Sequence, residues 1–79
     1  MNTQERKVIG MAGTQPIYDN YGEGVTVAKI GKDEYEISIP QRPRFGGVRK
    51  EIKYNNTVIE YAEASAQTIR NKKSKGRWD

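Results

Sequence analysis

The clearest pattern in the chain is an alternation of apolar and polar residues between residues 25 and 39. Residues 25–30 (VTVAKI) are largely β-branched, and residues 35–39 (YEISI) alternate strictly between apolar and polar side chains. A period of two is typical of strands that bury one face. Residues 31–34 (GKDE) have the composition of a turn, so the two segments predict a β-hairpin, which Pro40 ends.

Residues 48–54 (VRKEIKY) alternate less regularly and predict a third strand after a loop that contains Gly46 and Gly47. An alternating strand divides these residues into two faces. One face carries Val48, Lys50, Ile52 and Tyr54, and the other carries Arg49, Glu51 and Lys53. We expect the face with Arg49 and Lys53 to be the outer one.

The last apolar pattern, over residues 58–71, has the spacing of an amphipathic helix. Thr57 and Glu60 fit a capping box at its start. The predicted buried face carries Val58, Ala62, Ser65, Ala66 and Ile69, with Ile59 and Tyr61 at its margins. Small residues on this face would let the helix lie close to a sheet.

Residues 1–24 contain weaker signals. Residues 7–12 form a candidate short strand, and residues 17–24 read as a loop rich in turn residues. The sequence therefore predicts an α+β fold, in which a three-stranded antiparallel sheet, with residues 7–12 as a candidate fourth strand, packs against one C-terminal helix. Its parts are an N-terminal segment (1–24), a β-β-β-α domain (25–71) and a basic C-terminal tail (72–79).

Composition limits the chemistry available to this chain. Its 79 residues contain neither cysteine nor histidine, which removes disulfides, thiolate metal sites and the usual Ser-His and Cys-His nucleophiles. The densest carboxylate cluster, Asp33, Glu34 and Glu36, lies in and beside a turn, where solvated charge is the ordinary state. We expect a binding protein and no enzyme, with no cofactor and no metal. The polar first residues and the lack of a long apolar run predict a cytoplasmic location away from membranes.

Charge is unevenly distributed along the chain, whose net charge is +4. Residues 41–58 carry five cations against one anion, residues 69–79 have the same balance, and residues 15–40 carry five anions against two cations. Two basic blocks beside an acidic body indicate an anionic partner. Exposed arginine and lysine suit phosphate groups, so we expect nucleic-acid contacts from these blocks. The candidate residues are Arg42, Arg44, Arg49, Lys53, Lys72, Lys73, Lys75 and Arg77.

The order of three strands and a helix, with basic residues on the sheet side, resembles the arm-type DNA-binding domain of tyrosine recombinases and the related AP2-like domains. The likeness runs from about residue 25 to residue 72 and is carried by residues 31–37 (GKDEYEI), 46–50 (GGVRK) and 59–69. It implies that the open face of the sheet enters the major groove of DNA. The implied contacts come from Arg42, Arg44, Arg49 and Lys53.

The sequence-based hypothesis is thus a small accessory DNA-binding protein. The alternative is a protein-binding inhibitor or adaptor from a phage or mobile element. It would act through the tyrosine loop, which contains Tyr18 and Tyr21, through the acidic hairpin, which contains Asp33, Glu34 and Glu36, or through a sheet edge. An edge strand can also pair with a second copy of the same chain. Each aromatic candidate for a protein interface can equally pack against its own domain: Tyr18, Tyr21, Phe45 and Trp78.

Overall fold

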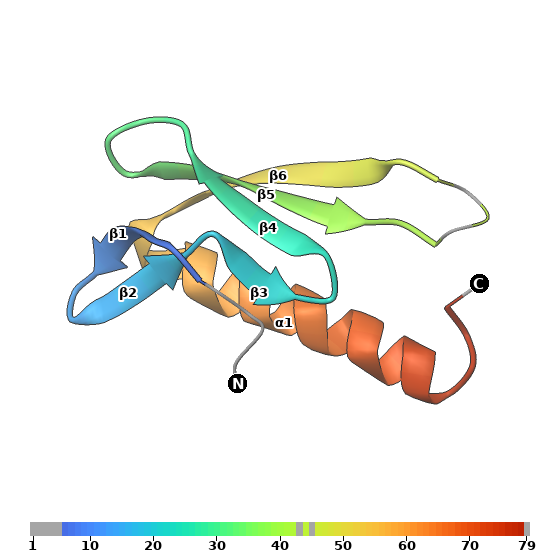
Figure 1. Cartoon of the computed structure of the whole chain (residues 1–79). Helices are drawn as coiled ribbons and strands as arrows, with labels where there is room; N and C mark the ends of the chain where they lie inside the picture. Colours follow the sequence, from blue (N-terminus) through green and yellow to red (C-terminus); the bar gives the residue numbers. More distant parts are fainter. Residues whose placement is uncertain (1–5, 43, 45, 79) are drawn as a thin grey trace.

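Six strands precede one C-terminal helix in the part of the chain that the computed structural model describes, residues 6–42, 44 and 46–78 (Figure 1). The strands are β1 (Val8–Ala12), β2 (Gln15–Tyr18), β3 (Asn20–Gly22), β4 (Val25–Lys29), β5 (Glu34–Pro40) and β6 (Val48–Tyr54), and the helix is α1 (Asn55–Ser74). β1 and β2 form a two-stranded antiparallel sheet. The other strands form an antiparallel sheet in the order β3-β4-β5-β6.

The predicted α+β class, the hairpin of β4 and β5, the third strand β6 and the C-terminal helix are confirmed. The structure has more strands than expected. Residues 7–12 do contain a strand, but β1 pairs with β2 and does not join the larger sheet. The fourth strand of that sheet is β3, from the segment predicted as a loop. This segment alternates turn residues with very short strands, and the Asn20 side chain accepts a hydrogen bond from the Gly22 amide at 2.7 Å.

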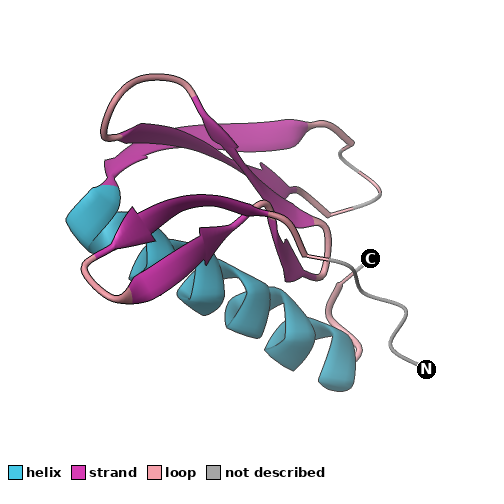
Figure 2. Cartoon of the chain, turned by 60° about the vertical axis from the view of Figure 1, so that its left-hand side comes forward, coloured by secondary structure: helices cyan, strands magenta, loops and turns pink. Residues whose placement is uncertain are grey.

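The core lies between α1 and one face of the larger sheet. Both Figure 1 and Figure 2 show α1 crossing this face, while no described segment lies over the opposite face. The predicted helix face is confirmed, because its apolar residues are buried and Ser65 is half-buried. The core residues are Ile17, Tyr21, Val25, Val27, Tyr35, Ile37, Ile39, Val58, Ala62, Ala66 and Ile69. Burial of Ile17 and Tyr21 makes the N-terminal segment part of the same core.

The helix begins earlier than predicted, and the capping box is wrong. α1 starts at Asn55, and its cap residue, Tyr54, makes no side-chain capping bond. The Thr57 hydroxyl instead donates to the Tyr54 carbonyl at 3.3 Å. The start is held by the turn between β4 and β5, because the Asn55 amide donates to the Asp33 carbonyl at 3.2 Å. None of the helices in the described ranges has the length and apolar character needed to cross a bilayer.

The two faces of β6 are reversed relative to the prediction. The register pairs Arg49 with Ile39, Glu51 with Ile37, and Lys53 with Tyr35. Since directly opposed residues share a face, these charged side chains lie on the face that α1 covers. The apolar side chains of β6 lie on the open face and are exposed: Val48 (54%), Ile52 (46%) and Tyr54 (54%). β6 is one of the two edge strands of this sheet, so side chains on its covered face can still reach solvent beside the helix.

Candidate nucleic-acid interface

The two basic blocks meet at one end of the molecule, where β5 leads into β6. The loop after β5 contributes Gln41 and Arg42 to a pocket of about 470 Å³. The end of α1 and the turn that follows contribute Lys72 and Trp78 to the same pocket. Figure 1 shows the C-terminus at the end of the molecule occupied by the β5–β6 loop. Residues thirty positions apart in the sequence therefore surround one hollow.

Trp78 reaches the pocket because the chain reverses direction after the helix. Gly76 has a φ of 71°, in the left-handed region that favours glycine. The Gly76 amide donates to the Lys73 carbonyl at 3.1 Å, and the Arg77 amide donates to the Lys72 carbonyl at 2.8 Å. The half-buried Trp78 ring then packs against the hydrophobic core. Of the two alternatives for this residue, docking onto its own domain is therefore the one observed.

The pocket lining is rich in hydrogen-bond donors. Three cationic side chains reach it, and none of the described residues that line it is acidic. They come from three different elements, namely Arg42 from the loop, Arg49 from β6 and Lys72 from α1. Three hydroxyl side chains on α1 complete the polar lining: Tyr61, Ser65 and Thr68. An anionic group in this pocket could accept charge-assisted hydrogen bonds, which are the stronger kind.

Arg49 is oriented by two neighbours. Its Nη2 atom donates to the Tyr61 hydroxyl at 2.8 Å, and its Nε atom lies 3.2 Å from a carboxylate oxygen of Glu51. Both members of this ion pair are substantially exposed, so the pair positions the guanidinium more than it stabilises the fold. Arg49 thus lies across the seam between β6 and α1, with its remaining donors available to a ligand.

Four of the other predicted nucleic-acid contacts lie in two different places. Arg44, Lys75 and Arg77 are exposed on the loop and the C-terminal turn that flank the pocket. Lys53 lies further along β6, where its Nζ atom is 4.5 Å from the centroid of the Tyr61 ring. It lines a second pocket of about 490 Å³ with residues of α1 and does not lie on the open face. The expectation that Arg49 and Lys53 project from the open sheet face is therefore wrong.

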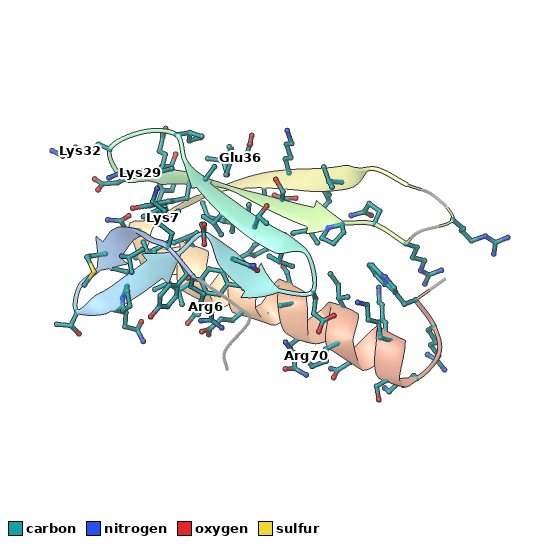
Figure 3. The ribbon with its side chains drawn as sticks, viewed as in Figure 1. Arg6, Lys7, Lys29, Lys32, Glu36 and Arg70 are labelled. Carbon is teal, nitrogen blue, oxygen red and sulfur yellow. The ribbon has the colours of Figure 1, made fainter. Side chains whose placement is uncertain are left out.

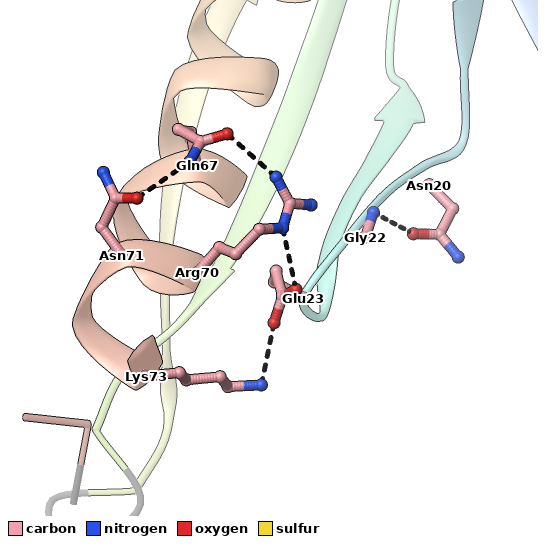
Figure 4. A network of polar contacts seen from close by, with 7 residues as sticks. All are labelled: Asn20, Gly22, Glu23, Gln67, Arg70, Asn71 and Lys73. Atoms are coloured by element: carbon pink, nitrogen blue, oxygen red, sulfur yellow. Dashed lines mark hydrogen bonds and ion pairs between the residues drawn. The ribbon is translucent and has the colours of Figure 1, made fainter. Parts of the chain in front are cut away.

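Lys73 is not among the described residues that line this pocket, and it takes part in a network of polar contacts (Figure 4). Its Nζ atom donates to Glu23 Oε1 at 2.9 Å, and Arg70 Nε donates to Glu23 Oε2 at 3.3 Å. The hydrogen bond from Lys73 is the main cause that lowers the pKa of the Glu23 carboxyl, and the positive charges of Lys73 and Arg70 add to it. The network connects the turn between β3 and β4 to the end of α1. The Lys73 side chain thus contacts another part of the same chain and is not placed to line the pocket.

The two tyrosines of the loop that was suggested as a protein interface, Tyr18 and Tyr21, pack against their own domain. Tyr21 is 7% exposed and belongs to the core, and its hydroxyl accepts a hydrogen bond from the Tyr18 amide at 3.1 Å. Tyr18 is half-buried, with its ring at 67° to that of Tyr21 and 6.2 Å between centroids. Burial raises the pKa of the Tyr21 hydroxyl. Phe45, the remaining aromatic candidate, lies outside the described residues.

Sequence reasoning missed the hydroxyl side of the pocket. Tyr61, Ser65 and Thr68 were visible only as residues on or beside the buried helix face. Their spacing of four and three places them along one side of a helix, which is a signal that could have been used. Their role depends on β6 lying alongside, and no local pattern specifies that neighbour.

Comparison of the chain with protein-family models, with curated protein sequences and with solved structures gave no match in any of the three cases.

Proposed function

We propose that this protein is a non-enzymatic, accessory DNA-binding protein that contacts nucleic acid through its basic end. We define the basic end as Arg42, Arg44, Arg49, Lys72, Lys75 and Arg77. The observation that carries the proposal is the pocket in which cations from a loop, a strand and a helix converge, with no acidic side chain among its described lining residues. Several cationic side chains at one end of the molecule can contact successive phosphates of a nucleic-acid backbone, which carries regularly spaced negative charge.

The arrangement of the basic end favours a phosphate backbone over a single small anion. Arg42, Arg49 and Lys72 line the pocket itself, while Arg44 and Arg77 are exposed beside it. A phosphate in the pocket would leave the flanking cations able to contact neighbouring phosphates. Guanidinium groups bind phosphate oxygens in a bidentate manner, which supports arginine as the main contact type.

The open sheet face is a weaker candidate for DNA than the resemblance to arm-type domains implies. In the observed register, Glu34 and Glu36 lie on the open face opposite Tyr54 and Ile52. Lys50 is the cation that β6 presents there. Carboxylates on this face would repel phosphate groups, whereas the lining of the pocket favours them. We therefore propose that the DNA contacts lie at the basic end and not on the open sheet face.

The test is fluorescence anisotropy of a labelled DNA duplex titrated with the protein at low and moderate salt. The double variant Arg42→Ala/Lys72→Ala removes two pocket cations. The control Lys29→Ala/Lys32→Ala removes the same charge from the opposite end of the molecule (Figure 3). We expect the unmodified protein to bind DNA in a salt-sensitive manner. The pocket variant should lose at least about tenfold in affinity, and the control should lose about twofold or less.

Two results would count against the proposal. Absence of binding at low salt would exclude nucleic acid as the partner, because electrostatic binding is strongest at low salt concentration. Equal losses in the pocket variant and the control would show that net charge alone drives association, without a site at the basic end.

A further inference from the structure

The outer edge of β6 presents backbone groups that none of the other described strands pairs with. β6 is the last strand in the order β3-β4-β5-β6, and it pairs with β5 over all seven residues without a register shift. It contains no proline, and the register shows no bulge that would twist its edge away. Long, regular edge strands of this kind are templates for pairing with another strand.

Two backbone hydrogen bonds at the ends of the β5–β6 ladder show which groups point outward. The Asn55 amide donates to the Asp33 carbonyl at 3.2 Å, and the Gln41 amide donates to the Gly47 carbonyl at 3.3 Å. Both pairs continue the β5–β6 register. Because hydrogen bonding alternates along an antiparallel ladder, the odd-numbered residues of β6 bond to β5. The residues that direct their amides to the free edge are therefore Val48, Lys50, Ile52 and Tyr54.

We propose that β6 pairs antiparallel with β6 of a second copy of this chain, which would join two four-stranded sheets into one. The pairing is isologous, since each strand offers the same edge to the other. The choice of a second copy follows from the charge pattern on the covered face of β6. Arg49, Glu51 and Lys53 alternate in sign along that face, and such a pattern can match its own reverse.

The charge pattern restricts the position of the two-fold axis. An axis at Lys50 places Arg49 opposite Glu51 in both halves, but it also sets the two Lys50 side chains directly opposite each other on the open face. An axis at Ile52 places Glu51 opposite Lys53 in both halves and opposes two apolar Ile52 side chains. An axis at Glu51 would instead oppose two Glu51 side chains and set Arg49 against Lys53. Directly opposed like charges destabilise a strand pair, whereas opposite charges stabilise it. The charge pattern therefore favours an axis at Ile52 over one at Lys50.

The apolar side chains on the open face support the same pairing. Val48 and Ile52 are 54% and 46% exposed in the single chain. An axis at Lys50 would place Val48 of each copy beside Ile52 of the other, and an axis at Ile52 would place the two Ile52 side chains together. Either arrangement covers apolar surface that the single chain leaves in water. Edge pairing buries little area, so we expect a dimer whose population rises with concentration.

Disulfide cross-linking tests the proposal directly, because the chain contains no cysteine of its own. Residues on the axis would form a hydrogen-bonded pair with Cα atoms about 5.5 Å apart, within the range that a disulfide spans. Ile52→Cys and Lys50→Cys are therefore oxidised separately under mild conditions. Ala28→Cys is the control, since Ala28 is exposed on the open face but belongs to the interior strand β4.

We expect rapid formation of covalent dimer by Ile52→Cys and at least about tenfold slower cross-linking by Ala28→Cys. The variant that reacts identifies the axis. Cross-linking of Ala28→Cys at the same rate as the edge variants would show random collision and overturn the proposal. Failure of both edge variants to cross-link would overturn it as well.

Sedimentation of the chain without cysteine provides an independent test. The sedimenting mass should rise toward twice that of the monomer with increasing concentration, and Ile52→Pro should abolish this rise. Because the Ile52 amide points away from β5, proline there removes an edge donor and leaves the β5–β6 ladder intact, which circular dichroism verifies. A protein that stays monomeric throughout the concentration series would overturn the proposal. DNA is absent from these experiments, so their outcome is separate from that of the proposed function.

Discussion

Replacing Gly10 with alanine should destabilise the protein, because β1 passes very close to the side chain of Tyr35. A Cβ atom built on Gly10 would overlap with the Tyr35 hydroxyl oxygen and would lie 3.0 Å from Cζ of the same ring. Tyr35 is 1% exposed, so its ring is enclosed by the core and has little room to move aside. Overpacking of a core typically costs about 1–3 kcal/mol, and the direct overlap places Gly10→Ala near 3 kcal/mol.

A loss of this size is large for a chain of 79 residues, whose total stability is expected to be roughly 4–12 kcal/mol. Urea denaturation followed by circular dichroism measures it. Tyr35→Phe removes the overlapping oxygen, so the double variant should recover about 1 kcal/mol or more relative to the sum of the single effects. Gly13→Ala is the control, since Gly13 has a φ of 64° and nothing within 4 Å of an added Cβ. It should cost only the backbone penalty of about 1–2 kcal/mol.

Two outcomes would refute the reasoning about Gly10. One is a stability loss no larger than that of Gly13→Ala, which would mean that β1 moves aside at little cost. The other is strict additivity of Gly10→Ala and Tyr35→Phe, which would show that the two positions do not touch in solution.

Three further predictions concern the basic end and the Glu23 network. If DNA is bound at the pocket, Arg42→Ala/Lys72→Ala should reduce the slope of log affinity against log salt concentration by about 2, because each phosphate contact contributes about 0.9. An unchanged slope would show that the phosphate contacts lie elsewhere. Trp78 is the sole tryptophan of the chain and lines the pocket, so its fluorescence should change as DNA binds; binding seen by anisotropy with constant emission would exclude the pocket. The hydrogen bond from Lys73 lowers the pKa of the Glu23 carboxyl below its ordinary value of 4.5. The stability that the ionised Glu23 contributes is therefore fully present above pH 4.5 and is lost as the pH falls through the lower pKa of the folded state. Glu23→Gln should therefore flatten the loss of stability in acid, and an identical pH profile for both proteins would contradict this role.

Much of the fold was predictable because its signals are local. The strict alternation of residues 35–39 specifies a strand with one buried face, and that face is the buried one. The helix face of Val58, Ala62, Ala66 and Ile69 follows from a period of 3.6 residues and is confirmed. The segment before β4 was harder to interpret, because strands of three and four residues separated by turn residues carry too short a pattern for periodicity to detect.

What the sequence by itself determined is therefore the class of the fold, the main hairpin, the buried helix face and the two blocks of positive charge. Only the tertiary structure decided how these parts are used. The faces of β6 depend on which residues of β5 stand opposite, and that register turns Arg49 toward α1 and Ile52 toward solvent. The pocket likewise requires the loop after β5 and the end of α1 to lie together. Alternation along a strand separates its two faces but does not say which one a helix will cover, because that choice is made by packing between segments distant in the sequence.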